Sequence, residues 1–139
     1  MSTTTKPFQV VNLGKYSEID YKDSQVPKKF LKEILQLTGM EISVTTIPAG
    51  VTFPFFHSHK ENEELYIVIQ GSGQIQADGE LIDVTEGSMV SMRPEVKRSL
   101  RANKETDLIY LCIQAKADSL NLWTKTDGIR NENVEWVQK

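Results

Sequence analysis

Cysteine and histidine are both scarce in this 139-residue chain, which contains one cysteine, Cys112, and two histidines. A single cysteine excludes an internal disulfide, so nothing in the sequence points to an oxidising compartment. Long apolar runs are also missing: no segment is long enough to span a bilayer, and the opening "MSTTTKPFQV" lacks the apolar core of a secretory signal. These absences predict a cytoplasmic protein that does not contact a membrane.

An excess of basic residues is absent as well, because 16 Lys and Arg stand against 19 Asp and Glu, for a net charge of −3. Nucleic-acid binding calls for a basic face, so we expect no nucleic-acid partner. Hydrophobic residues make up 39% of the chain and charged residues 25%, an ordinary composition for a globular protein. The length suits a single domain over residues 1–139, with a flexible tail at 1–6.

Most of the chain has the pattern of short β-strands separated by turn residues. The alternating or β-branched segments are 41–47, 64–70, 73–78, 80–84, 88–92, 98–103 and 107–115. Asp78-Gly79 between two of them is a strong signal for a tight hairpin. Many short strands at regular spacing predict an all-β antiparallel sandwich or barrel, with its core over residues 40–115.

One helix is expected before the strands, over residues 23–39. Its apolar side chains recur at helical spacing and form one stripe, made of Val26, Phe30, Leu31, Ile34 and Leu35. Asp23 or Ser24 can cap its start, Pro27 suits the first turn, and Gly39 can end it. The pattern therefore predicts a short surface helix that packs on the domain.

Two of the predicted strands, 64–70 and 107–115, are apolar on both faces. One face can line a barrel, whereas the other needs a second sheet, the helix or another subunit to cover it. We therefore expect a homodimer formed through a sheet face or an exchanged N-terminal strand. Trp123 and Trp136 lie in the polar C-terminal segment and are expected to close one end of the barrel or a dimer seam.

Both histidines fall within "PFFHSHKENEELYIVIQG", residues 54–71. Residues i and i+2 of a strand share a face, so His57 and His59 project together. Glu64 begins the next strand, and its neighbour Glu63 has the opposite parity. If the two strands are neighbours, two imidazoles and one carboxylate converge. That donor set suits a divalent transition metal such as Fe, Mn, Ni or Zn, and histidines on a loop rim without a ligand are the alternative.

The same residues resemble the first motif of the cupin family. Gly50, His57, His59, Glu64 and Gly71 reproduce its order, with one extra residue between Gly50 and His57. The similarity covers roughly residues 40–115 and is greatest to small single-domain bacterial cupins. The resemblance implies a double-stranded β-helix, which is a jelly-roll barrel, and homodimers are common in the family. It also implies that His57, His59 and Glu64 are metal ligands.

The second cupin motif departs from the family pattern. Counted from Gly87, its histidine position falls on Arg98, or on Ser99 if one residue is inserted. An arginine has no lone pair to give and cannot replace the fourth metal ligand. Three roles for Arg98 stay open: an ion pair with Glu64, a contact to an anionic ligand beside a three-ligand metal, or a place at the barrel mouth with the guanidinium in water.

These residues predict a metal-binding cupin that binds or acts on a small anionic molecule in the barrel. Arg98 and Tyr66 are the candidate ligand-binding residues, since the Tyr66 phenol, two residues past Glu64, can donate a hydrogen bond. A two-histidine-one-carboxylate metal would support dioxygenase or isomerase chemistry. The alternative is a non-catalytic dimer without metal, either binding a small molecule or acting as a regulatory protein.

Overall fold

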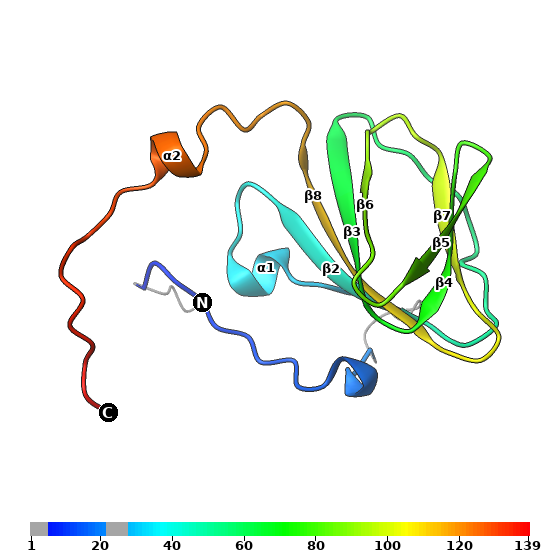
Figure 1. Ribbon diagram of the computed structural model, residues 1–139, viewed down its shortest axis with the longest axis horizontal. Coiled ribbons are helices and arrows are strands. Elements are labelled where there is room, and N and C mark those ends of the chain that lie inside the picture. Colours follow the sequence, from blue (N-terminus) through cyan, green and yellow to red (C-terminus); the bar gives the residue numbers. More distant parts are fainter. Residues whose placement is uncertain (1–5, 22–27) are drawn as a thin grey trace.

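The computed structural model of the chain describes residues 6–21 and 28–139, and its strands form two antiparallel sheets (Figure 1). The five-stranded sheet has the order β1-β2-β8-β3-β6, and the three-stranded sheet has the order β5-β4-β7. The strands are β1 (Lys28–Phe30), β2 (Glu41–Ile47), β3 (Asn62–Gln70), β4 (Ser72–Ala77), β5 (Glu80–Thr85), β6 (Met89–Met92), β7 (Arg98–Ala102) and β8 (Leu108–Lys116). The helices are η1 (Tyr16–Glu18), α1 (Lys32–Leu35) and α2 (Thr124–Asp127).

The core lies between the two sheets, which face each other in Figure 1. Alternate residues of each strand point inward, because successive side chains of a strand lie on opposite faces. The buried apolar side chains from the larger sheet include Ile47, Tyr66, Val68, Leu108 and Tyr110, and those from the smaller sheet include Ile75, Val84 and Leu100. This arrangement confirms the predicted all-β jelly-roll barrel.

The boundaries of β2 to β8 agree with the strands predicted from the sequence to within two residues at every end. The hairpin between β4 and β5 turns at Asp78 and Gly79, whose φ angles are 48° and 85°. Two consecutive positive φ values define the tight turn that Asp-Gly favours. This turn sets the register that pairs Ala77 with Glu80 and Gly73 with Val84.

The predicted helix over 23–39 is largely wrong. Lys28–Phe30 form β1 instead, paired with β2, and α1 has only four residues and ends at Gln36 (φ 54°) rather than at Gly39. The expected first part of the helix, including Val26, lies outside the described residues. Pairing with β2 gives the inner side of this edge strand backbone hydrogen-bond partners from the sheet, and a helix of this length is marginal without tertiary support.

Only part of the expected helical stripe is buried, since Leu31 is 5% exposed and Ile34 is 49% exposed. Of the flexible tail predicted at 1–6, residues 1–5 also lie outside the described part of the chain. None of the helices in residues 6–21 and 28–139 has the length and apolar character needed to cross a membrane.

The outer face of the five-stranded sheet is covered in part by the chain itself. Val44 and Ile109 are 0% and 1% exposed, although their side chains point away from the core. Tyr21 and Thr46 share a hydrogen bond of 3.0 Å, and α1 lies beside β2 on the same side as the N-terminal segment (Figure 1). The chain thus supplies some of the cover that the sequence led us to expect from a subunit, and the homodimer itself stays a prediction.

Two glycines with the same φ angle, Gly71 and Gly79, differ in how closely another part of the backbone approaches them. Gly71 and Gly79 both have φ of 85°, but a Cβ on Gly71 would overlap the carbonyl oxygen of Asp107, whereas nothing lies within 4 Å of a Cβ on Gly79. We expect Gly79→Ala to lower the free energy of unfolding by about 1–2 kcal/mol, through the left-handed conformation alone. Gly71→Ala should cost at least about 3 kcal/mol, because strain adds to that term. Urea unfolding of the two variants measures the difference, and equal losses would contradict the close approach.

Candidate metal centre

Backbone pairing brings the two histidines to the end of the barrel where β7 begins. His57 and Arg98 are joined by reciprocal backbone hydrogen bonds of 3.0 Å, and the His59 N–H donates to the Pro94 carbonyl at 2.7 Å. Directly opposed residues of an antiparallel pair project to the same side. The His57 and Arg98 side chains therefore enter the barrel together and meet Glu64 on β3.

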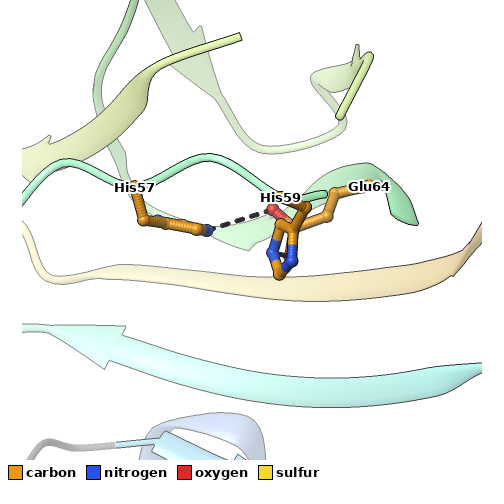
Figure 2. A group of neighbouring side chains, drawn as sticks. All are labelled: His57, His59 and Glu64. Atoms are coloured by element: carbon orange, nitrogen blue, oxygen red, sulfur yellow. Dashed lines mark hydrogen bonds and ion pairs between the residues drawn. The ribbon is translucent and has the colours of Figure 1, made fainter. Parts of the chain in front are cut away.

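The three predicted metal donors converge, as expected from the sequence (Figure 2). His57 Nε2 lies 3.3 Å from Glu64 Oε1, and His59 Nε2 lies 3.2 Å from Glu64 Oε2. The Glu64 side chain is 4% exposed, while the imidazoles of His57 and His59 are 30% and 26% exposed. The carboxylate is thus buried and the two rings lie between it and solvent.

Arg98 is completely buried beside the same carboxylate. Its Nη2 donates to Glu64 Oε1 at 2.5 Å and its Nε donates to that oxygen at 3.2 Å. Nη1 donates to main-chain carbonyls, at 2.6 Å for Val96 and 3.3 Å for Pro94. Of the three open roles for Arg98, the structure shows the ion pair with Glu64, and it places the guanidinium inside the barrel rather than at the mouth.

Ser99, the other candidate for the second-motif position, lies on the opposite face of β7. Its Oγ donates to the Phe55 carbonyl at 2.8 Å, and its side chain takes no part in the cluster around Glu64. The alignment that needs no inserted residue is therefore the one that the structure follows. Arg98 occupies the position where the family pattern has a histidine.

Two further side chains donate hydrogen bonds to Glu64. The Tyr66 hydroxyl donates to Oε1 at 2.7 Å, and the Cys112 thiol donates to Oε2 at 3.2 Å. Tyr66 and Cys112 are direct partners on neighbouring strands β3 and β8, which places both beneath the carboxylate. Cys112 lies on a strand that the sequence predicts, but the partner strand that brings its thiol to Glu64 could not be read from the spacing of residues.

These contacts set the charge state of Glu64, Tyr66 and Cys112. Burial alone would raise the pKa of Glu64, but hydrogen bonds from His57, Arg98, Tyr66 and Cys112 outweigh it and hold that pKa well below the ordinary range. Burial, together with the nearby negative charge of Glu64, raises the pKa of Tyr66 and of Cys112. Glu64 is therefore a carboxylate, whereas the phenol and the thiol are neutral and act as donors.

The donor set fits a divalent transition metal. Metal–donor bonds of about 2.1 Å at angles of about 90–109° place neighbouring donors roughly 3.0–3.4 Å apart. The separations of 3.3 and 3.2 Å that link His57 and His59 to Glu64 lie inside that range, but they run to different carboxylate oxygens and are hydrogen-bond distances as well. The fit to a single ion rests on the convergence of the three donor atoms, which lie within 4.8 Å of one another. The charge of Arg98 cancels that of Glu64, however, so an ion in this position meets no net negative charge from its surroundings.

The second ring nitrogen of His57, Nδ1, lacks the hydrogen bond that a metal-binding histidine usually makes. A histidine that binds metal through one nitrogen usually donates its other N–H to an acceptor. Within the described residues, His57 Nδ1 is buried and has no hydrogen-bond partner. This missing partner and the charge of Arg98 both reduce the affinity expected for a metal, although the three donors themselves are well placed.

A cavity of about 340 Å³ adjoins the cluster at His59. Its charged lining is balanced, with Lys60, Arg93 and Lys116 against Glu61, Glu95 and Asp118. Arg93 is already bound to Asp118, at 3.1 Å. The cavity gives a small polar molecule room beside the exposed edge of His59.

Comparison with known proteins identifies the family. Residues 43–114 match the cupin domain, and the chain belongs to the cupin family. A cupin protein from Bacteroides fragilis is 37% identical and has a TM-score of 0.79, with 91% of this chain and 98% of that chain covered. A search of curated proteins gives no match.

Two further solved structures show the same fold at low sequence identity. The plu4264 protein from Photorhabdus luminescens is 21% identical, with a TM-score of 0.61 and coverage of 77% of this chain and 90% of that chain. KdgF from Halomonas sp. is 16% identical, with a TM-score of 0.59 and coverage of 72% and 90%. These two similarities support the fold and do not extend to the site.

The coupling between Arg98 and Glu64 can be measured as stability. We expect Glu64→Leu to lower the free energy of unfolding by about 3–5 kcal/mol, because it leaves a buried guanidinium without its counterion. Arg98→Met should cost less, since Glu64 keeps its other donors. The double variant should cost clearly less than the sum of the two, and urea unfolding with a chelator present gives all three values.

Glu63 provides the matched control for this cycle. Its carboxylate is half exposed and lies 3.7 Å from Arg93. Glu63→Leu should therefore change the free energy of unfolding by less than about 1 kcal/mol. Strictly additive losses for Glu64→Leu and Arg98→Met would show that the two buried charges do not depend on each other.

Proposed function

We propose that this cupin binds a divalent transition metal through His57, His59 and Glu64, and that the open positions on the ion bind a small anionic molecule. The observation that carries the proposal is the convergence of the three side chains, which each place a donor atom within 4.8 Å of the other two. Three protein ligands with open positions are typical of metal centres that bind a second molecule. When bound, the ion would supply Lewis-acid or redox chemistry of the kind used by isomerases and dioxygenases.

Arg98 has a defined place in this proposal. It removes the fourth ligand that the family pattern supplies, which leaves one more position on the ion for an incoming molecule. Its hydrogen bonds to Glu64 hold the carboxylate in a single orientation, as does the bond from the Tyr66 hydroxyl. These contacts support positioning roles for Arg98 and Tyr66, and direct contact of either residue with a ligand stays a prediction.

The preference for an anion rests on charge. An ion held by one carboxylate, with Arg98 close by, leaves an excess of positive charge at the centre. The adjoining cavity adds no net charge, because Lys60, Arg93 and Lys116 are balanced by Glu61, Glu95 and Asp118, so the preference rests on the ion itself. An incoming carboxylate or phosphate would reduce this excess, whereas a cation would increase it.

A second function is favoured by the same ion pair. Arg98 already places a fixed cation against Glu64, and His57 Nδ1 lacks the acceptor that a metal ligand usually has. On this reading the chain is a metal-free module that binds a small molecule without transforming it. The two candidates differ in whether metal is needed for ligand binding.

Metal titration distinguishes the metal-binding function from the metal-free one. We expect chelator-stripped protein to bind one equivalent of Ni²⁺ or Zn²⁺ by calorimetry, and His57→Ala and His59→Ala to weaken binding at least about tenfold. Arg98→His should bind more tightly than the parent, because it adds a ligand and removes a repulsive charge. Arg98→Ala should gain less, because it removes the charge alone.

Glu63→Gln is the control and should bind metal as the parent does, since this carboxylate points away from the cluster towards Arg93. If neither the parent nor Arg98→His binds metal, the metal-free reading replaces the first proposal. Equal affinities for the parent, Arg98→His and Arg98→Ala would contradict the role given to the guanidinium charge.

Ligand binding gives an independent readout through the melting temperature. Oxalate is a suitable probe, because it is a small anion that can occupy two neighbouring positions on a metal. We expect oxalate to raise the melting temperature of the metal-loaded protein and not that of the stripped protein. A rise of equal size without metal would favour the metal-free module.

A further inference from the structure

We propose that the outer face of the three-stranded sheet binds the C-terminal segment of a second copy of this chain, so that two copies exchange these segments. The groove on that face, lined by β4, β5, β7 and residues 52–57, is called the sheet groove below. Residues 128–139 are called the C-terminal arm. The proposal concerns assembly and does not rest on the proposed metal function.

The sheet groove has an apolar centre. Cross-strand pairing places Leu81, Gln76 and Ser99 in one row on the outer face, and Phe56 lies at the end of that row. A cavity of about 160 Å³ lies among them. Phe56 and Leu81 are 47% and 55% exposed, so two large apolar side chains flank a hollow that the chain itself leaves open.

The groove continues in both directions across the sheet. A cavity of about 460 Å³ shares Phe56 and Gln76 with the central one and extends to Lys97. Another, of about 510 Å³, shares residues 52, 74 and 101 with it and extends to Lys104. The three hollows form one elongated groove, whose shape suits an extended segment better than a compact small molecule.

One wall of the groove is already ordered by its own hydrogen bonds. The Gln74 amide nitrogen donates to Asp83 and to Asn103, both at 3.0 Å, and Arg101 Nε donates to the Gln74 oxygen at 2.9 Å. These side chains satisfy one another and are held in place. The apolar row beside them is the part of this face whose burial by a partner would remove the most apolar surface from water.

The C-terminal arm carries exposed apolar side chains that could fill such a groove. Ile129, Val134, Trp136 and Val137 are 96%, 80%, 89% and 94% exposed, so no part of the described chain covers them. A tryptophan is among the side chains that contribute most to an interface when buried. Figure 1 shows the arm running away from the barrel on the side of the five-stranded sheet, opposite to the three-stranded sheet.

The five-stranded sheet is a poorer site for the arm. On its outer face Val44 and Ile109 are already buried by the chain's own N-terminal segment and α1. The groove has no such cover. Its ends carry charges of both signs, Asp78 with Lys97 and Glu105 with Lys104, and so does the arm, in which Arg130 and Lys139 balance Glu132 and Glu135. Apolar contact rather than net charge therefore favours the pairing. Since each copy carries one arm and one groove, a two-fold pair satisfies both surfaces twice.

Complementation between two variants tests the exchange. The groove variant carries Phe56→Asp and Leu81→Asp, and the arm variant carries Trp136→Ser and Val137→Ser. We expect the parent to have twice the 15.8 kDa chain mass by light scattering at micromolar concentration, and each variant alone to be monomeric. An equimolar mixture should regain dimers, because one intact arm then meets one intact groove.

Met89→Asp is the matched control, because Met89 is also an exposed apolar residue (67%) but lies on the five-stranded sheet. It should leave the dimer intact. Far-ultraviolet spectra and melting temperatures confirm that every variant is folded, since all the changed side chains are exposed. Stripping metal from all samples with a chelator keeps this result separate from the metal titration.

A monomeric parent, a dimeric groove variant or a mixture that stays monomeric would each overturn the proposal. A monomeric parent in which Trp136 is protected from a fluorescence quencher would show that the arm docks on its own chain. A dimer lost in Met89→Asp but kept in the groove variant would place the interface on the five-stranded sheet.

Discussion

The buried pair of Arg98 and Glu64 sets the character of this barrel. A carboxylate that is almost fully removed from water is costly unless its charge is balanced and its oxygens accept hydrogen bonds. Arg98 supplies the charge, and Tyr66 and Cys112 supply further hydrogen bonds from two neighbouring strands. Arg98 is also joined to His57 through the main chain, so one residue fixes both the electrostatics of the site and the path of the segment that carries the histidines.

The fold could be predicted to a large extent, because its signal is local. Strand alternation and the Asp78-Gly79 turn each depend on a few neighbouring residues, and the structure reproduces them. The helix over 23–39 failed for a physical reason. A segment with an apolar stripe at helical spacing can also form an edge strand. Residues 28–30 become a strand because they pair with β2, which lies later in the chain.

The candidate site also contains some contacts that the sequence predicted and others that it did not. Strand parity predicted that His57, His59 and Glu64 converge on the condition that the histidine segment lies beside the strand of Glu64. The three side chains do converge, but the histidine segment is not a regular strand and pairs through His57 with Arg98 on β7. Arg98 could be placed only by the family pattern, because it comes from a distant strand. The contact of Cys112 with Glu64 and those of Arg98 with the carbonyls of Val96 and Pro94 depend on tertiary register and had no signal in the sequence.

The loop that precedes β7 is shaped around the guanidinium. Nη1 of Arg98 is directed at three main-chain carbonyls, those of Arg93, Pro94 and Val96. A histidine at position 98 is too short and has too few donors to satisfy all three, so the loop would lose partners that it now has. A histidine at position 98 would therefore add a donor to the metal centre while removing the hydrogen bonds that hold the loop before β7. Metal affinity and the order of this loop are thus linked through one side chain.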